Sequence, residues 1–144
     1  MRESLRSALV LSALLGGLLA CRTDKPEDQV KRAFETCRLA VEAGDAAGAT
    51  APLDPSFRGP DGMDKPTARL FLMGTFRQER VGVTVLRNVV SVRGSEANQE
   101  VDLVLTGRSG GLLPQDASQR SFQLRWRKSG GDWKLAEIQA LDGR

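Results

Sequence analysis

The sequence predicts an α+β fold in which N-terminal helices pack on a four-stranded antiparallel sheet. Apolar residues recur at helical spacing in residues 26–43 and 65–78, and they alternate with polar residues from position 81 onward. A chain of 144 residues has room for one domain whose core is stable without disulfides. The change in period therefore places the helices first and the sheet after them.

Residues 1–20 are typical of a signal peptide. Two arginines precede an uncharged apolar run that is shorter than the roughly 20 residues of a membrane span. The run ends in Leu-Leu-Ala-Cys at positions 18–21, which resembles the lipobox of bacterial lipoproteins. The resemblance implies cleavage before Cys21 and acylation of its thiol. The alternative is an ordinary secretory signal followed by an incidental cysteine.

If Cys21 is lipidated, residues 21–25 form a short tether and residues 26–141 form the folded domain. Arg22 stands where enteric bacteria commonly place an aspartate that retains lipoproteins in the inner membrane. By that analogy we expect a cell-envelope protein on the outer membrane, facing the periplasm. Cys37 then has no partner within the chain, and we interpret it as a small buried apolar residue rather than a reactive or intermolecular thiol.

Capping residues define the predicted helices. We expect Asp24 to cap the helix that ends at residue 43, and a short alanine-rich helix over 45–53 to end in a turn at Asp54. Phe57 should hold the following loop against the core. The helix over 65–78 presents an apolar face broad enough to lie on the sheet, and Gly74 within it suggests a close approach between the two.

The first two predicted strands cover residues 81–92 and 101–106. The first is long enough to need a bend or a bulge, and the short connection between them predicts an antiparallel hairpin. A glycine-rich and polar loop follows over residues 108–120. It contains an apolar pair, Leu112-Leu113, which either folds over the core or is exposed for a partner.

The last hairpin contains both tryptophans. Leu124 and Trp126 alternate with polar residues, a glycine-containing turn follows at 129–132, and Trp133 and Leu135 belong to the final strand. Because the chain is only 5% aromatic, this hairpin should supply a large share of the aromatic core.

The pairing register of this hairpin determines where Glu137 points. If Lys128 lies opposite Trp133, then Leu124 faces Glu137 on the core side. If Lys128 pairs with Asp132 instead, Glu137 turns outward, because a slip of one residue moves every side chain to the other face. We favour the first register, since it buries both tryptophans.

Composition limits the chemistry. The chain has no histidine and no tyrosine, so the commonest general base and metal ligand are missing. Its net charge of +3 comes from basic and acidic residues without a basic stripe, which argues against nucleic-acid binding. We expect Glu100 and Asp102 to face away from the core and to pair with Arg125 and Arg127.

The order of elements, together with Gly131-x-Trp133-x-Leu135 in the final hairpin, resembles the nuclear-transport-factor-2-like superfamily, also called SnoaL-like or cystatin-like. The resemblance covers residues 26–141 and extends to small bacterial lipoproteins of that superfamily. It implies a curved sheet wrapped around helices into a cone whose mouth can be a pocket. Enzymatic members use carboxylates, histidines or tyrosines inside the cone, and no such residue can be carried over to this chain.

These observations predict a non-catalytic, membrane-anchored binding domain with no cofactor and no metal. The candidate pocket residues are Trp126, Trp133, Leu135 and Glu137. The expected partners are a membrane, reached through Cys21, and an envelope protein or a small apolar ligand; a homodimer through the sheet is left open. The alternative is an isomerase or dehydratase that uses a single pocket carboxylate.

Overall fold

The structure is a computed structural model that describes residues 24–107 and 119–141. The predicted lipobox and Leu112-Leu113 lie outside these ranges. Within them, no helix combines the length and the apolar character needed to cross a membrane. The elements are, in chain order, α1 (Pro26–Glu42), α2 (Ala46–Thr50), β1 (Leu53–Arg58), η1 (Pro60–Gly62), α3 (Lys65–Gln78), β2 (Gly82–Arg93), β3 (Glu96–Thr106), β4 (Gln119–Ser129) and β5 (Asp132–Ala140).

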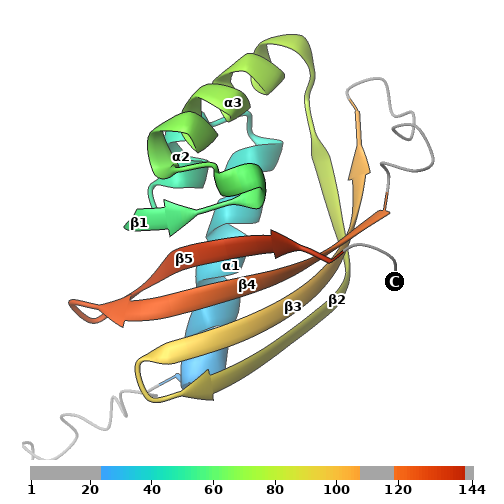
Figure 1. Ribbon diagram of the computed structural model, residues 1–144. Helices are drawn as coiled ribbons and strands as arrows, with labels where there is room; N and C mark the ends of the chain where they lie inside the picture. Colours follow the sequence, from blue (N-terminus) through green and yellow to red (C-terminus); the bar gives the residue numbers. More distant parts are fainter. Residues whose placement is uncertain (1–23, 108–118, 142–144) are drawn as a thin grey trace, which may run out of the picture.

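One curved sheet and the helices on its inner face form the core (Figure 1). The strand order is β1-β5-β4-β3-β2, and α1 runs across the sheet. Val30 of α1, Val101 of β3 and Trp126 of β4 are among the most deeply buried side chains. The α+β class predicted from the change of period is therefore confirmed.

The sheet has five strands rather than the predicted four, and it is not wholly antiparallel. β1 pairs in parallel with β5 at the edge of the sheet, where we had expected a turn and a loop. Pro55 explains the error, because proline lacks an N–H and makes a segment look unlike a strand, yet it is tolerated in an edge strand. Phe57, on this strand, is buried as expected.

α1 has the predicted extent but not the predicted cap. Lys25 occupies the N-cap position and makes no side-chain capping hydrogen bond. Asp24 lies one residue earlier, and its carboxylate pairs with Arg32 instead. Its backbone oxygen accepts a hydrogen bond from the side chain of Gln29. The carboxylate thus holds the residue that precedes the N-cap of α1 against the second turn of the helix.

α3 begins as predicted but does not lie across the face of the sheet. The Asp64 carboxylate accepts a hydrogen bond from the Thr67 N–H at 2.9 Å, and the helix contacts α2 and β1. Ala68 is its buried residue, whereas Leu70 and Phe71 are exposed. A side chain at Gly74 would meet nothing within 4 Å, so the predicted close approach to the sheet is wrong. The apolar spacing identified a helix, but α3 packs on α2 and on the edge strand β1 rather than across the face of the sheet.

A bulge in β5 makes the pairing register of the last hairpin differ from the predicted one. Lys128 lies opposite Trp133 and Trp126 opposite Leu135, as we favoured, but Leu124 lies opposite Ile138 and Arg125 opposite Glu137. Ala136 is the extra residue. Because a bulge reverses the alternation of side chains, the core-facing set continues from Leu135 to Ile138 and Glu137 turns outward. A second bulge lies in β2, where the length of the strand predicted a bend or a bulge. Leu86 is its extra residue, since Val85 pairs with Leu103 and Arg87 pairs with Asp102.

The ion pairs of the outer sheet face differ from those expected. Glu100 pairs with Arg87 at 2.9 Å, and Asp102 accepts a hydrogen bond from the Ser121 hydroxyl at 2.7 Å. Arg125 pairs with Glu137. The prediction was wrong because the register places Gln123, not an arginine, opposite Glu100.

Candidate functional site

An apolar pocket of about 300 Å³ lies between the inner face of the sheet and the helices. Strands β2, β3, β4 and β5 form one wall, and residues of α1, α2, β1, η1 and α3 contribute to the other. Two of the predicted pocket residues, Trp126 and Leu135, line it. A concave apolar site of this size lies at the lower limit of the pockets that bind small molecules.

Four lining side chains contain a hydrogen-bond donor, namely Cys37, Arg38, Thr50 and Trp126. The Thr50 hydroxyl donates a hydrogen bond to the Ala46 backbone oxygen at 2.8 Å. Burial raises the pKa of the Cys37 thiol to about 11, so this group is uncharged at neutral pH. No aspartate or glutamate is found among the described lining residues.

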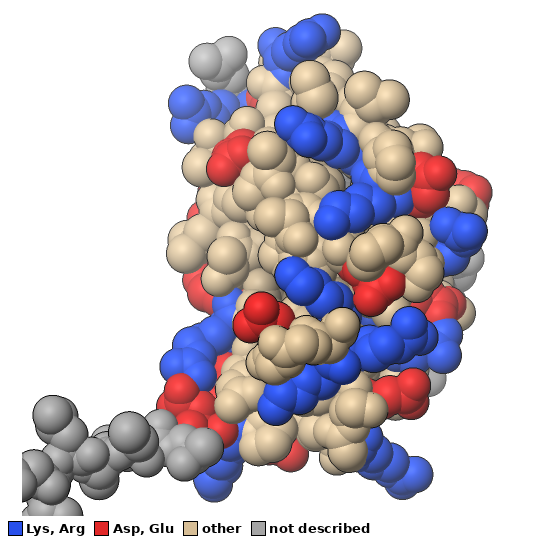
Figure 2. Space-filling view, turned by 90° about the vertical axis from the view of Figure 1, so that its left-hand side faces the viewer, with Lys and Arg blue, Asp and Glu red and all other residues tan. Residues whose placement is uncertain are grey.

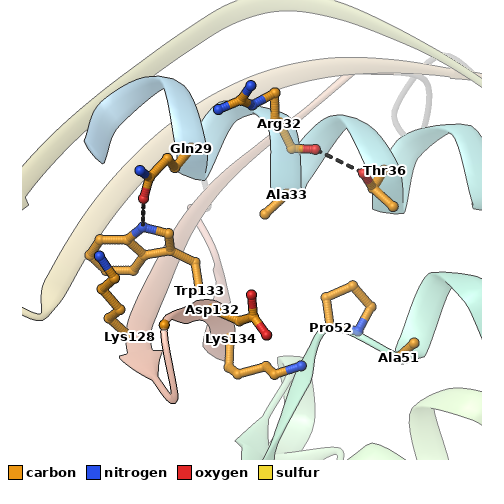
Figure 3. Close-up of a pocket in the computed structure, with 11 residues that line it drawn as sticks. Gln29, Arg32, Ala33, Thr36, Ala51, Pro52, Lys128, Asp132, Trp133 and Lys134 are labelled. Carbon is orange, nitrogen blue, oxygen red and sulfur yellow. Dashed lines mark hydrogen bonds between the residues drawn. The ribbon is translucent and has the colours of Figure 1, made fainter. Parts of the chain in front are cut away.

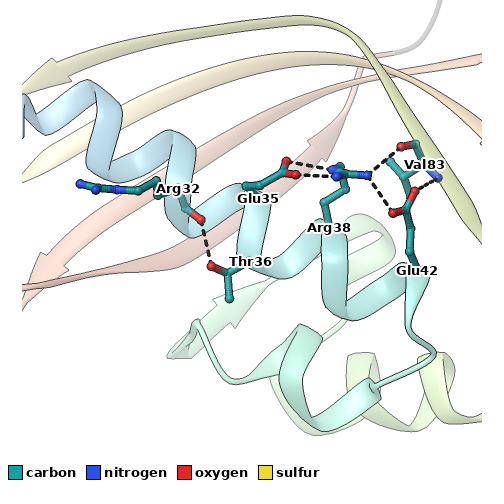
Figure 4. Close-up of polar contacts among 6 residues, drawn as sticks. All are labelled: Arg32, Glu35, Thr36, Arg38, Glu42 and Val83. Carbon is teal, nitrogen blue, oxygen red and sulfur yellow. Dashed lines mark hydrogen bonds and ion pairs between the residues drawn. The ribbon is translucent and has the colours of Figure 1, made fainter.

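Arg38 holds α1 against the free edge of β2 (Figure 4). Its Nε donates to Glu35 at 2.8 Å, and its Nη1 reaches Glu42 at 2.9 Å and the Val83 backbone oxygen at 3.3 Å. The Val83 N–H in turn donates to Glu42 at 3.0 Å. Both backbone groups of this edge residue are thereby satisfied, and the guanidinium is already bonded to Glu35, Glu42 and Val83.

The contact between Glu35 and Arg38 makes a pH-dependent contribution to the stability of the protein. The hydrogen bond from Arg38 holds the pKa of Glu35 below its ordinary value. A carboxyl group whose pKa is lowered by folding stabilises the protein fully above its unfolded pKa, and this contribution is lost as the pH falls through the folded pKa. We expect Arg38→Gln to raise the Glu35 pKa toward the ordinary value of a glutamate in an NMR titration.

Arg32→Gln is the matched control for this titration, because Arg32 lies on the same helix but pairs with Asp24. The Glu35 pKa should not change in that variant. An unchanged Glu35 pKa in Arg38→Gln would contradict the assignment of the shift to Arg38.

The Trp126 indole is bonded inside the core, beneath the pocket. Its Nε1 donates to Gln99 Oε1 at 2.8 Å, and the Gln99 amide donates to Asn88 at 2.8 Å. Trp126 and Gln99 are both 0% exposed. Because the indole N–H already has a partner, Trp126 offers the pocket hydrocarbon surface only.

Trp133 lies in a different place, an open cleft of about 540 Å³ beside α1 (Figure 3). Its Nε1 donates to Gln29 at 3.2 Å, and the Lys128 ammonium lies 5.8 Å from the ring centroid. Arg32 also lines this cleft, but its charge is paired with Asp24. The two tryptophans flank one turn, yet they contribute to separate sites.

Glu137 lies on the opposite face of the sheet from the pocket. It lines a small polar depression with Arg125 and Gln139, and both of these side chains donate hydrogen bonds to its carboxylate. The structure therefore separates the four predicted residues: Trp126 and Leu135 line the pocket, Trp133 lines the cleft and Glu137 faces outward. Cys21 lies outside the described residues.

Several pocket residues were not predicted as such. Phe34, Cys37 and Val41 form one apolar stripe of α1 that we interpreted only as core. Arg38 and Phe71 had no signal in the sequence, because a charged residue and an exposed aromatic residue line the pocket only through tertiary placement. Among the described residues, no group of three or more His, Cys, Asp or Glu side chains could hold a metal ion.

The molecular surface carries mixed charge. In Figure 2, acidic side chains lie among the basic ones over the face shown. This distribution agrees with the small net charge of +3. The face thus differs from the continuous basic surface typical of nucleic-acid binding.

No protein-family model matches this chain, and no curated protein sequence matches it significantly. Solved structures do share its fold. A protein of unknown function with a cystatin-like fold from Nostoc punctiforme has a TM-score of 0.65 at 16% identity, over 79% of this chain and 88% of the other. An NTF2-like protein from Cytophaga hutchinsonii has a TM-score of 0.65 at 14% identity, over 82% and 100%.

A further NTF2-like protein with a cystatin-like fold, from Novosphingobium aromaticivorans, has a TM-score of 0.67 at 14% identity, over 81% of this chain and 82% of the other. These similarities confirm the fold expected from the order of elements. At such low identity they establish the fold alone.

Proposed function

We propose that this chain is a lipid-anchored protein of the cell envelope whose domain binds a small apolar ligand without catalysing a reaction. The observation that carries the proposal is the chemistry of the pocket wall. Four of its side chains contain a hydrogen-bond donor, of which Cys37 is uncharged and Arg38, Thr50 and Trp126 are already hydrogen-bonded, and most of the rest of the wall is hydrocarbon. Such a wall favours an apolar ligand.

The residues of the pocket wall also help to decide between ligand binding and the enzymatic alternative. An isomerase or dehydratase of the predicted kind needs a carboxylate base within reach of its substrate. Glu137, the carboxylate considered for that role, faces away from the pocket and is bonded to Arg125. The absence of a carboxylate among the described lining residues supports binding over catalysis.

The direction of α1 is compatible with an anchor at Cys21. α1 begins at the end of the molecule opposite α3 (Figure 1). Two residues separate Cys21 from Asp24, so the two can be about 10 Å apart at most. In the proposed arrangement, the start of α1 would lie close to the membrane and the α3 side of the pocket would face the aqueous compartment.

Protection of Cys37 from alkylation tests the pocket. In a Cys21→Ser chain, Cys37 is the single thiol. Because its pKa is about 11, roughly one thiol in 1,000 is ionised at pH 8, so maleimide should react slowly and faster by about tenfold per pH unit up to pH 9. Saturation with N-phenyl-1-naphthylamine, an uncharged apolar probe, should slow this reaction at least about tenfold, because the probe occupies the space in front of the thiol.

The matched control is a Thr36→Cys chain that also carries Cys21→Ser and Cys37→Ser. Thr36 precedes Cys37 on α1 but is exposed. Its cysteine should react at the same rate with and without the probe. Equal reaction rates of Cys37 in the presence and absence of the probe would contradict the proposed ligand site.

A further inference from the structure

The wall that α3 contributes to the pocket is less firmly packed than the others. α1 buries Val30 and Phe34, whereas α3 buries Ala68 alone. Leu70 is 68% exposed and Phe71 is 60% exposed. Because burial of apolar side chains is the main force that fixes a helix on a protein, α3 is held more weakly than α1.

The attachment of α3 is also uneven along its length. At its N-terminal end, Asp64 caps the helix and the Lys65 ammonium donates to the Leu53 backbone oxygen at 2.8 Å. In the part of the chain that the structure describes, no hydrogen bond joins residues 70–78 to another element. Gly74, in the C-terminal half, has no neighbour within 4 Å of the position its Cβ would take. The first turn is therefore held by hydrogen bonds, whereas residues 70–78 are held by packing contacts alone.

Phe71 belongs both to the pocket and to the surface. Its side chain lines the pocket together with Leu72, although more than half of it remains in contact with solvent. Leu70, the preceding residue, is equally exposed and does not line the pocket. An exposed aromatic ring at the rim of an apolar pocket would gain buried area only when a ligand fills the space beside it.

We propose that α3 is the movable wall through which an apolar ligand enters the pocket, and that Phe71 closes over the ligand and determines how long it is retained. This inference rests on the proposed function, because it assigns the entry route and a specificity-determining residue to the same pocket. Ligands too short to reach the rim would gain nothing from Phe71. Ligands that fill the pocket to the rim would bury its ring.

The test measures binding of N-phenyl-1-naphthylamine by energy transfer from tryptophan, in the Cys21→Ser chain. Trp126 lines the pocket, so a probe bound there lies next to a donor. Phe71→Ala should raise the dissociation constant about tenfold, mainly through faster dissociation in stopped-flow measurements. Phe71→Leu should recover part of this loss. Leu70→Ala is the matched control, and this variant should bind the probe as tightly as the Cys21→Ser chain without a further substitution.

Hydrogen exchange provides a second readout that does not depend on a substitution. Amides of residues 70–78 should exchange faster than those of α1, and probe binding should slow them. Probe binding that is equally strong in Phe71→Ala and Leu70→Ala, or α3 amides that exchange as slowly as those of α1, would overturn this inference and leave the proposed function intact. A failure of the unsubstituted chain to bind the probe would overturn both.

Discussion

Trp126→Ala should destabilise the domain by about 3–5 kcal/mol, the range seen when large aromatic side chains are removed from cores. Trp126 is 0% exposed, so the substitution leaves a large cavity beneath the pocket. It also removes the indole N–H that donates to Gln99, a buried polar side chain that would keep only its bond to Asn88. Urea unfolding followed by circular dichroism measures the loss.

Two further variants separate the causes. Trp126→Phe keeps an aromatic ring but removes the donor to Gln99, and it should give a smaller loss. Val89→Ala shortens an exposed side chain of the same sheet and should change the stability by less than about 0.5 kcal/mol. A loss of less than about 1 kcal/mol for Trp126→Ala would show that this residue does not organise the core.

Cys21→Ser should abolish lipid attachment altogether, if the proposed anchor is correct. Acylation requires the cysteine thiol, which serine lacks. When the full chain is produced in a Gram-negative host, the unsubstituted protein should incorporate labelled palmitate and the variant should incorporate none. The variant should also keep its first 20 residues and migrate as a larger species.

Cys37→Ser is the control for this experiment, because it removes the other cysteine of the chain. Cys37 lines the apolar pocket, and its substitution should leave palmitate incorporation unchanged. Incorporation of label into Cys21→Ser would place the acyl group elsewhere. The absence of label from the unsubstituted protein would refute the lipoprotein proposal.

Helices and strands could be predicted from the sequence where the local pattern of residues agreed with the tertiary environment. The final hairpin is the clearest case, since alternating apolar residues and a glycine-containing turn are local features and Trp126 is buried as expected. β1 is the opposite case. Its pairing with β5 joins residues about 80 positions apart, and Pro55 conceals the strand.

The pocket was only partly predictable for a related reason. Trp126 and Leu135 could be assigned to the inner sheet face by alternation. Glu137 could not, because alternation assumes a regular strand and the bulge at Ala136 reverses it. Phe71 could not either, since helical spacing shows which residues share a face but not which neighbour covers that face.

By itself, the sequence determined the helices and four of the strands, the two hairpins and the burial of the tryptophans, because hydrophobic period, capping residues and turn residues act over a few positions. Only the tertiary structure decided the fifth strand, the outward turn of Glu137, the exposed side of α3 and the separation of Trp126 from Trp133. These features depend on contacts between segments distant in the chain, whose free energy is gained only when the whole core assembles.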